Sequence, residues 1–123
     1  MRFLFLFMDG VGLGANDPQS NPFATAEMPN LTALLGGKRL LAGNEPLDTV
    51  RATLLPLDPF MDVAGLPQSA TGQASLITGK NVPQRVGKHW GPKPNRETAA
   101  VLDEGTLFST LVERGYKAAL LNA

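Results

Sequence analysis

Asp9 is the first residue whose type and position could support metal chemistry. It directly follows an apolar run and precedes Gly10. A carboxylate is a hard oxygen ligand for a divalent cation, and the glycine lets the backbone turn tightly beside the ion. Position alone leaves two interpretations open, because a carboxylate that caps or turns a loop produces the same pattern.

A second candidate site lies in residues 65–79, where Ser69 follows Pro67 and precedes an expected helix. A hydroxyl there lies at the positive end of the helix dipole, beside backbone N–H groups that have no partner within the helix. That environment stabilises an anion, including a phosphoryl group on the hydroxyl itself. A hydroxyl that only caps the helix is the commoner use of this pattern. The residues by themselves therefore leave Ser69 between a cap and a phosphoryl site.

A basic stretch follows this second motif. Between residues 63 and 96 there is no acidic residue, and the stretch holds the single histidine, His89, and five cations: Lys80, Arg85, Lys88, Lys93 and Arg96. Charge of one sign beside a phosphoryl site attracts an anionic substrate, although acids elsewhere in the chain could balance it instead. Prolines and glycines interrupt the stretch, so residues 81–104 are expected to form an irregular basic excursion.

Strands must position these motifs at a common edge. Residues 3–8 form a continuous apolar run, which is typical of a strand buried on both faces of a parallel sheet. Residues 49–55 and 116–121 are expected to form further strands. In such a sheet, ligands bind outside the carboxyl ends of the strands, where Asp9 would lie.

Helices are expected between these strands, over residues 29–35, 73–80 and 106–114. Each of these segments carries apolar residues at helical spacing and ends at a glycine. Strands alternating with helices predict an α/β fold with an open, mostly parallel sheet and flanking helices.

Composition sets the remaining bounds. The 123 residues suffice for one domain, 43% are hydrophobic, and 11 Lys and Arg balance 11 Asp and Glu. This balance implies neither a nucleic-acid nor a membrane partner, and no stretch approaches the roughly 20 apolar residues of a membrane helix. The run of residues 3–8 is too short for a secretory signal, so a cytoplasmic protein is expected. Cysteine is absent, which excludes disulfides, thiolate zinc sites and a cysteine nucleophile.

Together these stretches resemble the alkaline phosphatase superfamily, especially cofactor-independent phosphoglycerate mutases, phosphopentomutases and nucleotide pyrophosphatase/phosphodiesterases. Residues 5–10, Phe-Leu-Phe-Met-Asp-Gly, resemble the first strand of that family, whose Asp binds a catalytic metal. Residues 68–73, Gln-Ser-Ala-Thr-Gly-Gln, share Ser and Gly with the mutases' Asn-Ser-Glu-Val-Gly-His run, which carries the nucleophile. In the phosphodiesterases a Thr-Gly pair follows the nucleophile at the spacing that separates Ser69 from Gly79. Both alignments select Ser69.

The resemblance implies that residues 1–123 are the N-terminal part of one alkaline phosphatase-like α/β domain, incomplete in this chain. It implies a longer parent enzyme that binds two divalent ions, zinc or manganese, with Asp9 and Ser69 among their ligands. Ser69 would be the nucleophile in metal-dependent phosphoryl transfer or phosphoester hydrolysis, and this fragment alone would be inactive. The substrate would be a phosphorylated small molecule, contacted by Gly72, Gln73, Lys88 and His89.

Two further expectations remain open. Ala70 and Gln73 stand where the mutases have Glu and His, so the resemblance does not extend to their substrate. The alternative to an enzyme is a non-catalytic α/β module that binds a nucleotide or a sugar phosphate. In either case an incomplete sheet exposes an edge, through which the chain is expected to self-associate.

Overall fold

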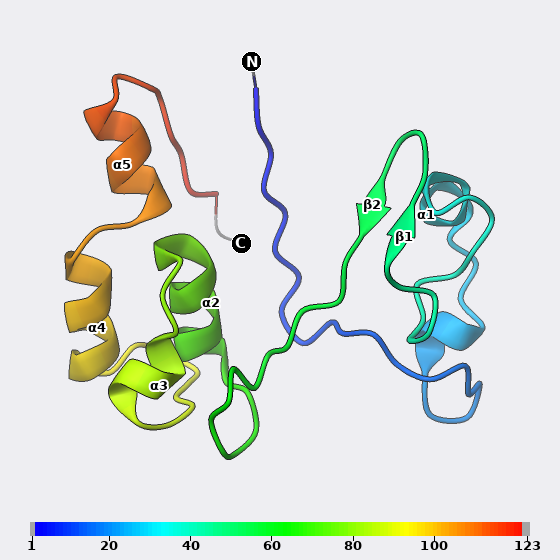
Figure 1. The fold of residues 1–123 in the computed structure, drawn as a ribbon, viewed down its shortest axis with the longest axis horizontal. Coiled ribbons are helices and arrows are strands. Elements are labelled where there is room, and N and C mark those ends of the chain that lie inside the picture. Colours follow the sequence, from blue (N-terminus) through cyan, green and yellow to red (C-terminus); the bar gives the residue numbers. More distant parts are fainter. Residues whose placement is uncertain (1, 122–123) are drawn as a thin grey trace. The chain divides into compact units, whose positions relative to one another are not determined.

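The computed structural model describes residues 2–121 and divides the chain into two compact units, Met1–Leu57 and Asp58–Ala123. Unit 1 contains the short 3-10 helix η1 (Pro22–Ala24), helix α1 (Pro29–Leu34) and strands β1 (Leu47–Asp48) and β2 (Thr53–Leu54) (Figure 1). Unit 2 contains four helices, α2 (Ser69–Thr78), α3 (Val82–Val86), α4 (Arg96–Asp103) and α5 (Leu107–Glu113).

Unit 1 is organised around a hairpin. Strands β1 and β2 pair antiparallel, with Leu47 opposite Leu54. Thr49 shapes the turn, because its hydroxyl accepts hydrogen bonds from the N–H groups of Arg51 and Ala52 at 3.2 and 3.0 Å. The same hydroxyl donates to the carbonyl of Leu34 at 2.8 Å. One side chain thus joins the hairpin to the end of α1.

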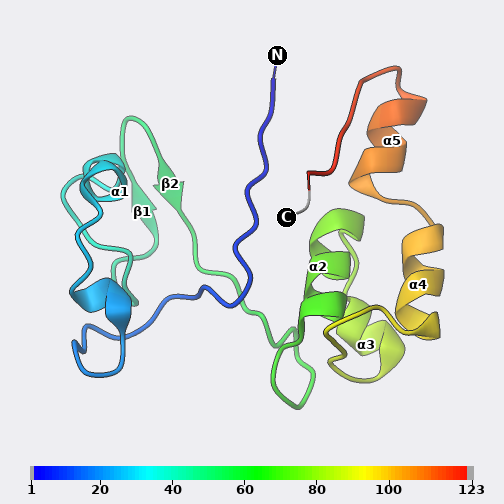
Figure 2. The same cartoon turned by 180° about the vertical axis from the view of Figure 1, so that it is seen from behind.

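Unit 2 is a helical cluster in which α2 contacts α3, α4 and α5 (Figure 2). Its core joins Ala74 of α2, Val82 of α3 and Val101 of α4, all buried. Ser75 links α2 to α3, since its hydroxyl accepts a hydrogen bond from the Val82 N–H at 3.1 Å. The core side chains are small, so polar links between elements contribute a large share of the specificity of this fold.

An exposed ion triad supplements that core. The carboxylate of Glu104, at the end of α4, lies 2.7 Å from both the Lys80 ammonium and the Arg85 guanidinium. These hydrogen bonds, the one from Arg85 foremost, lower the pKa of Glu104 from 4.5 to about 2. The triad fastens the end of α4 to α3 and to the end of α2.

The expectation of an open, mostly parallel α/β sheet is wrong. The described part of the chain is mostly helical, and its one sheet has two antiparallel strands. Residues 3–8 and 116–121 form no strand; Leu4 is 84% exposed and Leu121 is 92% exposed. A strand buried on both faces needs hydrogen-bonded neighbours and a covering layer, and residues 2–121 provide neither to these two segments. The strand expected over residues 49–55 is reduced to β2, because Thr49 and the residues after it form the hairpin turn.

Helices are confirmed at all three expected places, with different bounds. α1 starts at Pro29, and α5 has Thr106 as N-cap in a capping box with Ser109. α2 begins at Ser69, before the expected start at Gln73, and ends as expected at Gly79, which is left-handed. The irregular excursion expected over residues 81–104 instead contains two helices, α3 and α4.

Asparagine caps explain both unexpected helices. The side chain of Asn81 accepts from the Gln84 N–H at the start of α3, and that of Asn95 accepts from the Thr98 N–H at the start of α4.

Within residues 2–121, no helix combines the length and the apolar character that a bilayer crossing demands.

Acid titration tests the ion triad. Because the folded pKa of Glu104 lies below its ordinary value, the triad stabilises the fold fully above pH 4.5 and loses this contribution as the pH falls toward 2. In Glu104→Gln, the free energy of unfolding should fall less steeply across this window than in the wild type. Urea titrations at several pH values measure this, with Glu113→Gln as the matched control, since the exposed Glu113 forms no ion pair among the described residues. Equal slopes in both variants would contradict the assignment.

The exposed apolar run of residues 3–8 gives self-association a different basis from the sheet edge expected above. An uncharged apolar segment with no covering layer favours pairing with another copy. Leu4→Lys combined with Leu6→Lys should therefore reduce the average mass measured by light scattering at high protein concentration. Leu57→Lys, which changes an exposed leucine of the same unit outside the run, is the control. A mass that responds equally to both sets of changes would rule out the run as the cause.

Candidate functional site

Ser69 is the first residue of α2, a helix of ten residues. The N-cap is Gln68, whose extended backbone precedes the helix and whose side chain makes no capping hydrogen bond. The side chain of Ser69 is half-buried rather than enclosed in apolar packing. The capping interpretation of Ser69 is therefore wrong, because the hydroxyl stands in the first turn and not at the cap.

The irregular segment that joins α3 to α4 passes the start of α2, where Trp90 is bonded to Thr71 (Figure 2). The Thr71 N–H donates to the Trp90 carbonyl at 3.0 Å, and the Trp90 N–H donates to the Thr71 hydroxyl at 3.1 Å. The hydroxyl proton of Thr71 in turn has two acceptors within reach, the carbonyls of Trp90 at 3.3 Å and Gln68 at 3.4 Å. Thr71 is fully buried, so these bonds form away from water. We call this set of contacts the Thr71–Trp90 clamp.

Gly91 continues the clamp toward Ser69. A Cβ atom at position 91 would lie 3.1 Å from the backbone nitrogen of Ser69 and 3.2 Å from the Cβ of Gln68. Those separations are tighter than ordinary van der Waals contact, so only glycine lets the two backbones approach this closely.

Lys88 and His89 belong to the same clamped segment. The Lys88 ammonium lies 4.7 Å from the centroid of the Trp90 ring, which is the geometry of a cation–π contact. The indole N–H of Trp90 donates to the Lys93 carbonyl at 3.0 Å, which fixes the ring. The Nε2 atom of His89 lies 3.2 Å from the Val63 carbonyl, within hydrogen-bonding distance. Each ring is therefore held by a backbone carbonyl.

Five of the six site residues predicted from the sequence lie in unit 2: Ser69, Gly72, Gln73, Lys88 and His89. Ser69, Gly72 and Gln73 share the first turns of α2; Gly72 is half-buried and Gln73 is exposed. The clamp brings the segment with Lys88 and His89 beside that helix start. Asp9 lies in unit 1, where its side chain is exposed and Gly10 adopts the left-handed turn expected from the sequence.

The metal ligands implied by the resemblance form only part of a site. A zinc or manganese ion needs about four or more ligands. Within residues 2–121, no group of three or more His, Asp or Glu side chains is placed to hold an ion. The described residues therefore do not make up the two-ion centre of the alkaline phosphatase superfamily.

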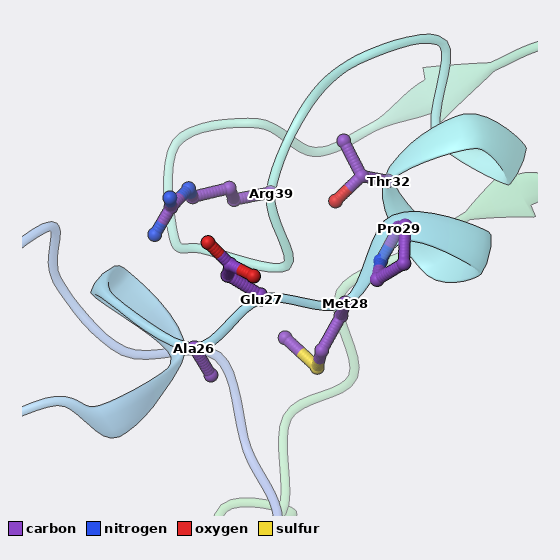
Figure 3. A pocket seen from close by; sticks show the side chains of 6 residues that line it. All are labelled: Ala26, Glu27, Met28, Pro29, Thr32 and Arg39. Atoms are coloured by element: carbon purple, nitrogen blue, oxygen red, sulfur yellow. The ribbon is translucent and has the colours of Figure 1, made fainter.

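The cavity of unit 1 lies away from all of these residues in sequence. It has a volume of about 250 Å³ and is lined by six side chains, Ala26, Glu27, Met28, Pro29, Thr32 and Arg39 (Figure 3). Arg39 also donates a hydrogen bond to the Ala24 carbonyl. Because the lining carries one acid and one base, it gives an anion no clear electrostatic preference.

Comparisons of the chain with models of protein families, with curated proteins and with solved structures each gave no match.

Sequence reasoning missed Thr71 and Gly91 as site residues. The motifs assign no role to Thr71, and Gly91 is one of the glycines that interrupt the basic stretch. The clamp joins residues 19 apart, so no local spacing indicates it. The available signal was a glycine directly after the single tryptophan, which is compatible with a close backbone approach.

Two buried threonines of unit 2 provide a matched test of the clamp. Thr71 and Thr98 are both fully buried, but the Thr98 hydroxyl has no hydrogen-bond partner among the described residues. Thr71→Val should destabilise the protein by about 1–3 kcal/mol, because the Trp90 N–H loses its acceptor. Thr98→Val should stabilise it by about 1 kcal/mol, because an unsatisfied buried hydroxyl is removed. Urea unfolding measures both changes, and shifts of the same sign would refute the contrast.

Proposed function

We propose that this chain carries the nucleophile of a metal-dependent enzyme that transfers or hydrolyses a phosphoryl group, with Ser69 as the nucleophile. The observation that carries this proposal is the position of Ser69 in the first turn of α2, beside the clamped segment with Lys88. The resemblance of residues 5–10 and 68–73 to the alkaline phosphatase superfamily supports the same assignment.

Local charge supports an anionic substrate. Glu104 pairs with Lys80 and Arg85, which removes those two cations from consideration as substrate ligands. Lys88 forms no ion pair within residues 2–121, and no acidic residue occurs between residues 63 and 96. The positive end of the α2 dipole adds to this field, so a phosphorylated small molecule is the substrate class that we propose.

The reaction follows from these groups. The Ser69 oxygen attacks phosphorus, and its new bond to phosphorus forms as the bond to the leaving oxygen breaks. The leaving oxygen departs with the bonding electron pair, and the hydroxyl proton passes to water. Water in a hydrolase, or an acceptor hydroxyl in a mutase, then attacks the phosphoserine and releases Ser69. The positive end of the α2 dipole and the Lys88 ammonium stabilise the charge on the phosphoryl oxygens.

The metal belongs to the proposal through the resemblance. Two divalent ions, zinc or manganese, would supply Lewis acidity when bound, and Asp9 is the proposed ligand in unit 1. Because residues 2–121 do not complete an ion site, the proposal requires further ligands from a longer parent protein. We propose that this protein acts in the cytoplasm.

Phosphoserine formation tests the proposal. The parent protein, supplied with Zn²⁺ or Mn²⁺ and with p-nitrophenyl phosphate as donor, should carry a phosphoryl group on the peptide containing Ser69, detected by mass spectrometry. Ser69→Ala should abolish this adduct and lower the turnover rate by about 10³-fold or more. Thr110→Ala, which removes an exposed hydroxyl from α5, should retain the activity of the wild type.

Metal removal distinguishes a metal-dependent enzyme from a non-catalytic binding module. EDTA should suppress turnover in the wild type, and added Zn²⁺ or Mn²⁺ should restore it. Affinity for p-nitrophenyl phosphate that survives both EDTA and Ser69→Ala, with no adduct formed, would instead support a non-catalytic module that binds phosphate esters.

A further inference from the structure

We infer that Thr71 and Gly91 are positioning residues for Ser69, because they fix the clamped segment against the turn that carries the nucleophile. The inference rests on the proposed function, since it assumes that Ser69 is phosphorylated. Neither residue contacts the transferred group in this scheme. Both act through the relative placement of Ser69 and the segment that carries Lys88.

The clamp is the hydrogen-bonded attachment of this segment to α2. The other bonds of residues 88–91 run to Val63 and to Lys93, and neither of these residues belongs to a helix. Thr71 holds Trp90 to α2 through both its N–H group and its hydroxyl. A side-chain change at Thr71 that spares the core would loosen the segment, because only the bond from the Thr71 N–H to the Trp90 carbonyl would remain, while α2 itself would stay folded.

Lys88 follows the movement of Trp90. Its ammonium lies over the indole ring, and that ring is part of the residue whose backbone the clamp holds. Displacement of the Trp90 backbone therefore changes the position of the cation relative to Ser69. A misplacement of about 1 Å in a reacting geometry can cost about 100-fold in rate, even when the substrate still binds.

Gly91 contributes the close approach itself. Its missing side chain leaves space that a Cβ atom would occupy at 3.1 Å from the Ser69 nitrogen. Gly91→Ala keeps every hydrogen bond of the clamp available but forces the two backbones apart by a few tenths of an ångström. This variant thus perturbs the placement of Ser69 by a route independent of the Thr71 hydroxyl.

A purely structural role for Thr71 makes a different prediction. If the clamp only stabilised the fold, Thr71→Val would lower the melting temperature and leave kcat unchanged in the folded fraction. A positioning role lowers kcat in protein that is fully folded, with little change in KM. The two roles therefore separate in the kinetic constants measured well below the melting temperature.

The experiment measures kcat and KM for p-nitrophenyl phosphate in the parent protein with Zn²⁺ or Mn²⁺. We expect Thr71→Val to lower kcat by about 10- to 100-fold with KM changed by less than about threefold. Thr71→Ser, which keeps the hydroxyl, should recover most of that loss. Thr98→Val, the buried threonine with no hydroxyl bond, should retain the kcat of the wild type.

Gly91→Ala provides the second variant in case Thr71→Val does not fold. We expect it to lower kcat by about tenfold, whereas Gly12→Ala should not, since no atom lies within 4 Å of a Cβ built at position 12. Trp90 is the single tryptophan of the 123 residues. In a preparation of these residues alone, acrylamide quenching of its fluorescence therefore measures the solvent access of the clamped segment in every variant. Thr71→Val should increase this quenching, and Thr98→Val should not.

The outcomes distinguish this inference from the proposed function. A wild-type protein that forms no phosphoserine would overturn both. A wild type that is phosphorylated on Ser69, with folded Thr71→Val and Gly91→Ala variants that keep its kcat, would overturn the positioning role and leave the proposed function standing. Loss of kcat in these variants, with recovery in Thr71→Ser, supports both.

Discussion

The hydrogen bonds between Thr71 and the backbone of Trp90 are the constraint on which the candidate site depends. They convert an irregular, proline-rich segment into a fixed neighbour of the α2 start. Because Thr71 is fully buried, its bonds are costly to break without replacement. These bonds bring the segment with Lys88 and His89 beside the helix turn that carries Ser69.

The basic side chains of unit 2 make two kinds of contact. Glu104 engages Lys80 and Arg85, and this pairing ties helix ends together around a core of small side chains. Lys88 is not drawn into that triad and lies instead on the Trp90 ring. The basic stretch is thus neither wholly a solvated face nor wholly a binding surface. Its first two cations serve the fold, and Lys88 is the cation that we propose for the anionic substrate.

Local signals account for the parts of the fold that the sequence predicted correctly. Pro29 and Thr106 start helices because a fixed φ and a side-chain cap act within a few residues. Asn81 and Asn95 carry the same kind of signal but were obscured by the prolines around them. The strand expected over residues 3–8 failed for the opposite reason. Apolar runs specify burial only when other segments supply hydrogen bonds and cover.

By itself, the sequence determined that helices form near residues 29–35, 73–80 and 106–114, that Ser69 stands near a helix start, and that the following stretch is basic. These properties depend on neighbours within about one helical turn. Only the tertiary structure decided that Glu104 pairs with Lys80 and Arg85, and that Thr71 and Gly91 hold the segment with Lys88. Those results depend on contacts between residues some 20 positions apart, whose geometry no local pattern encodes.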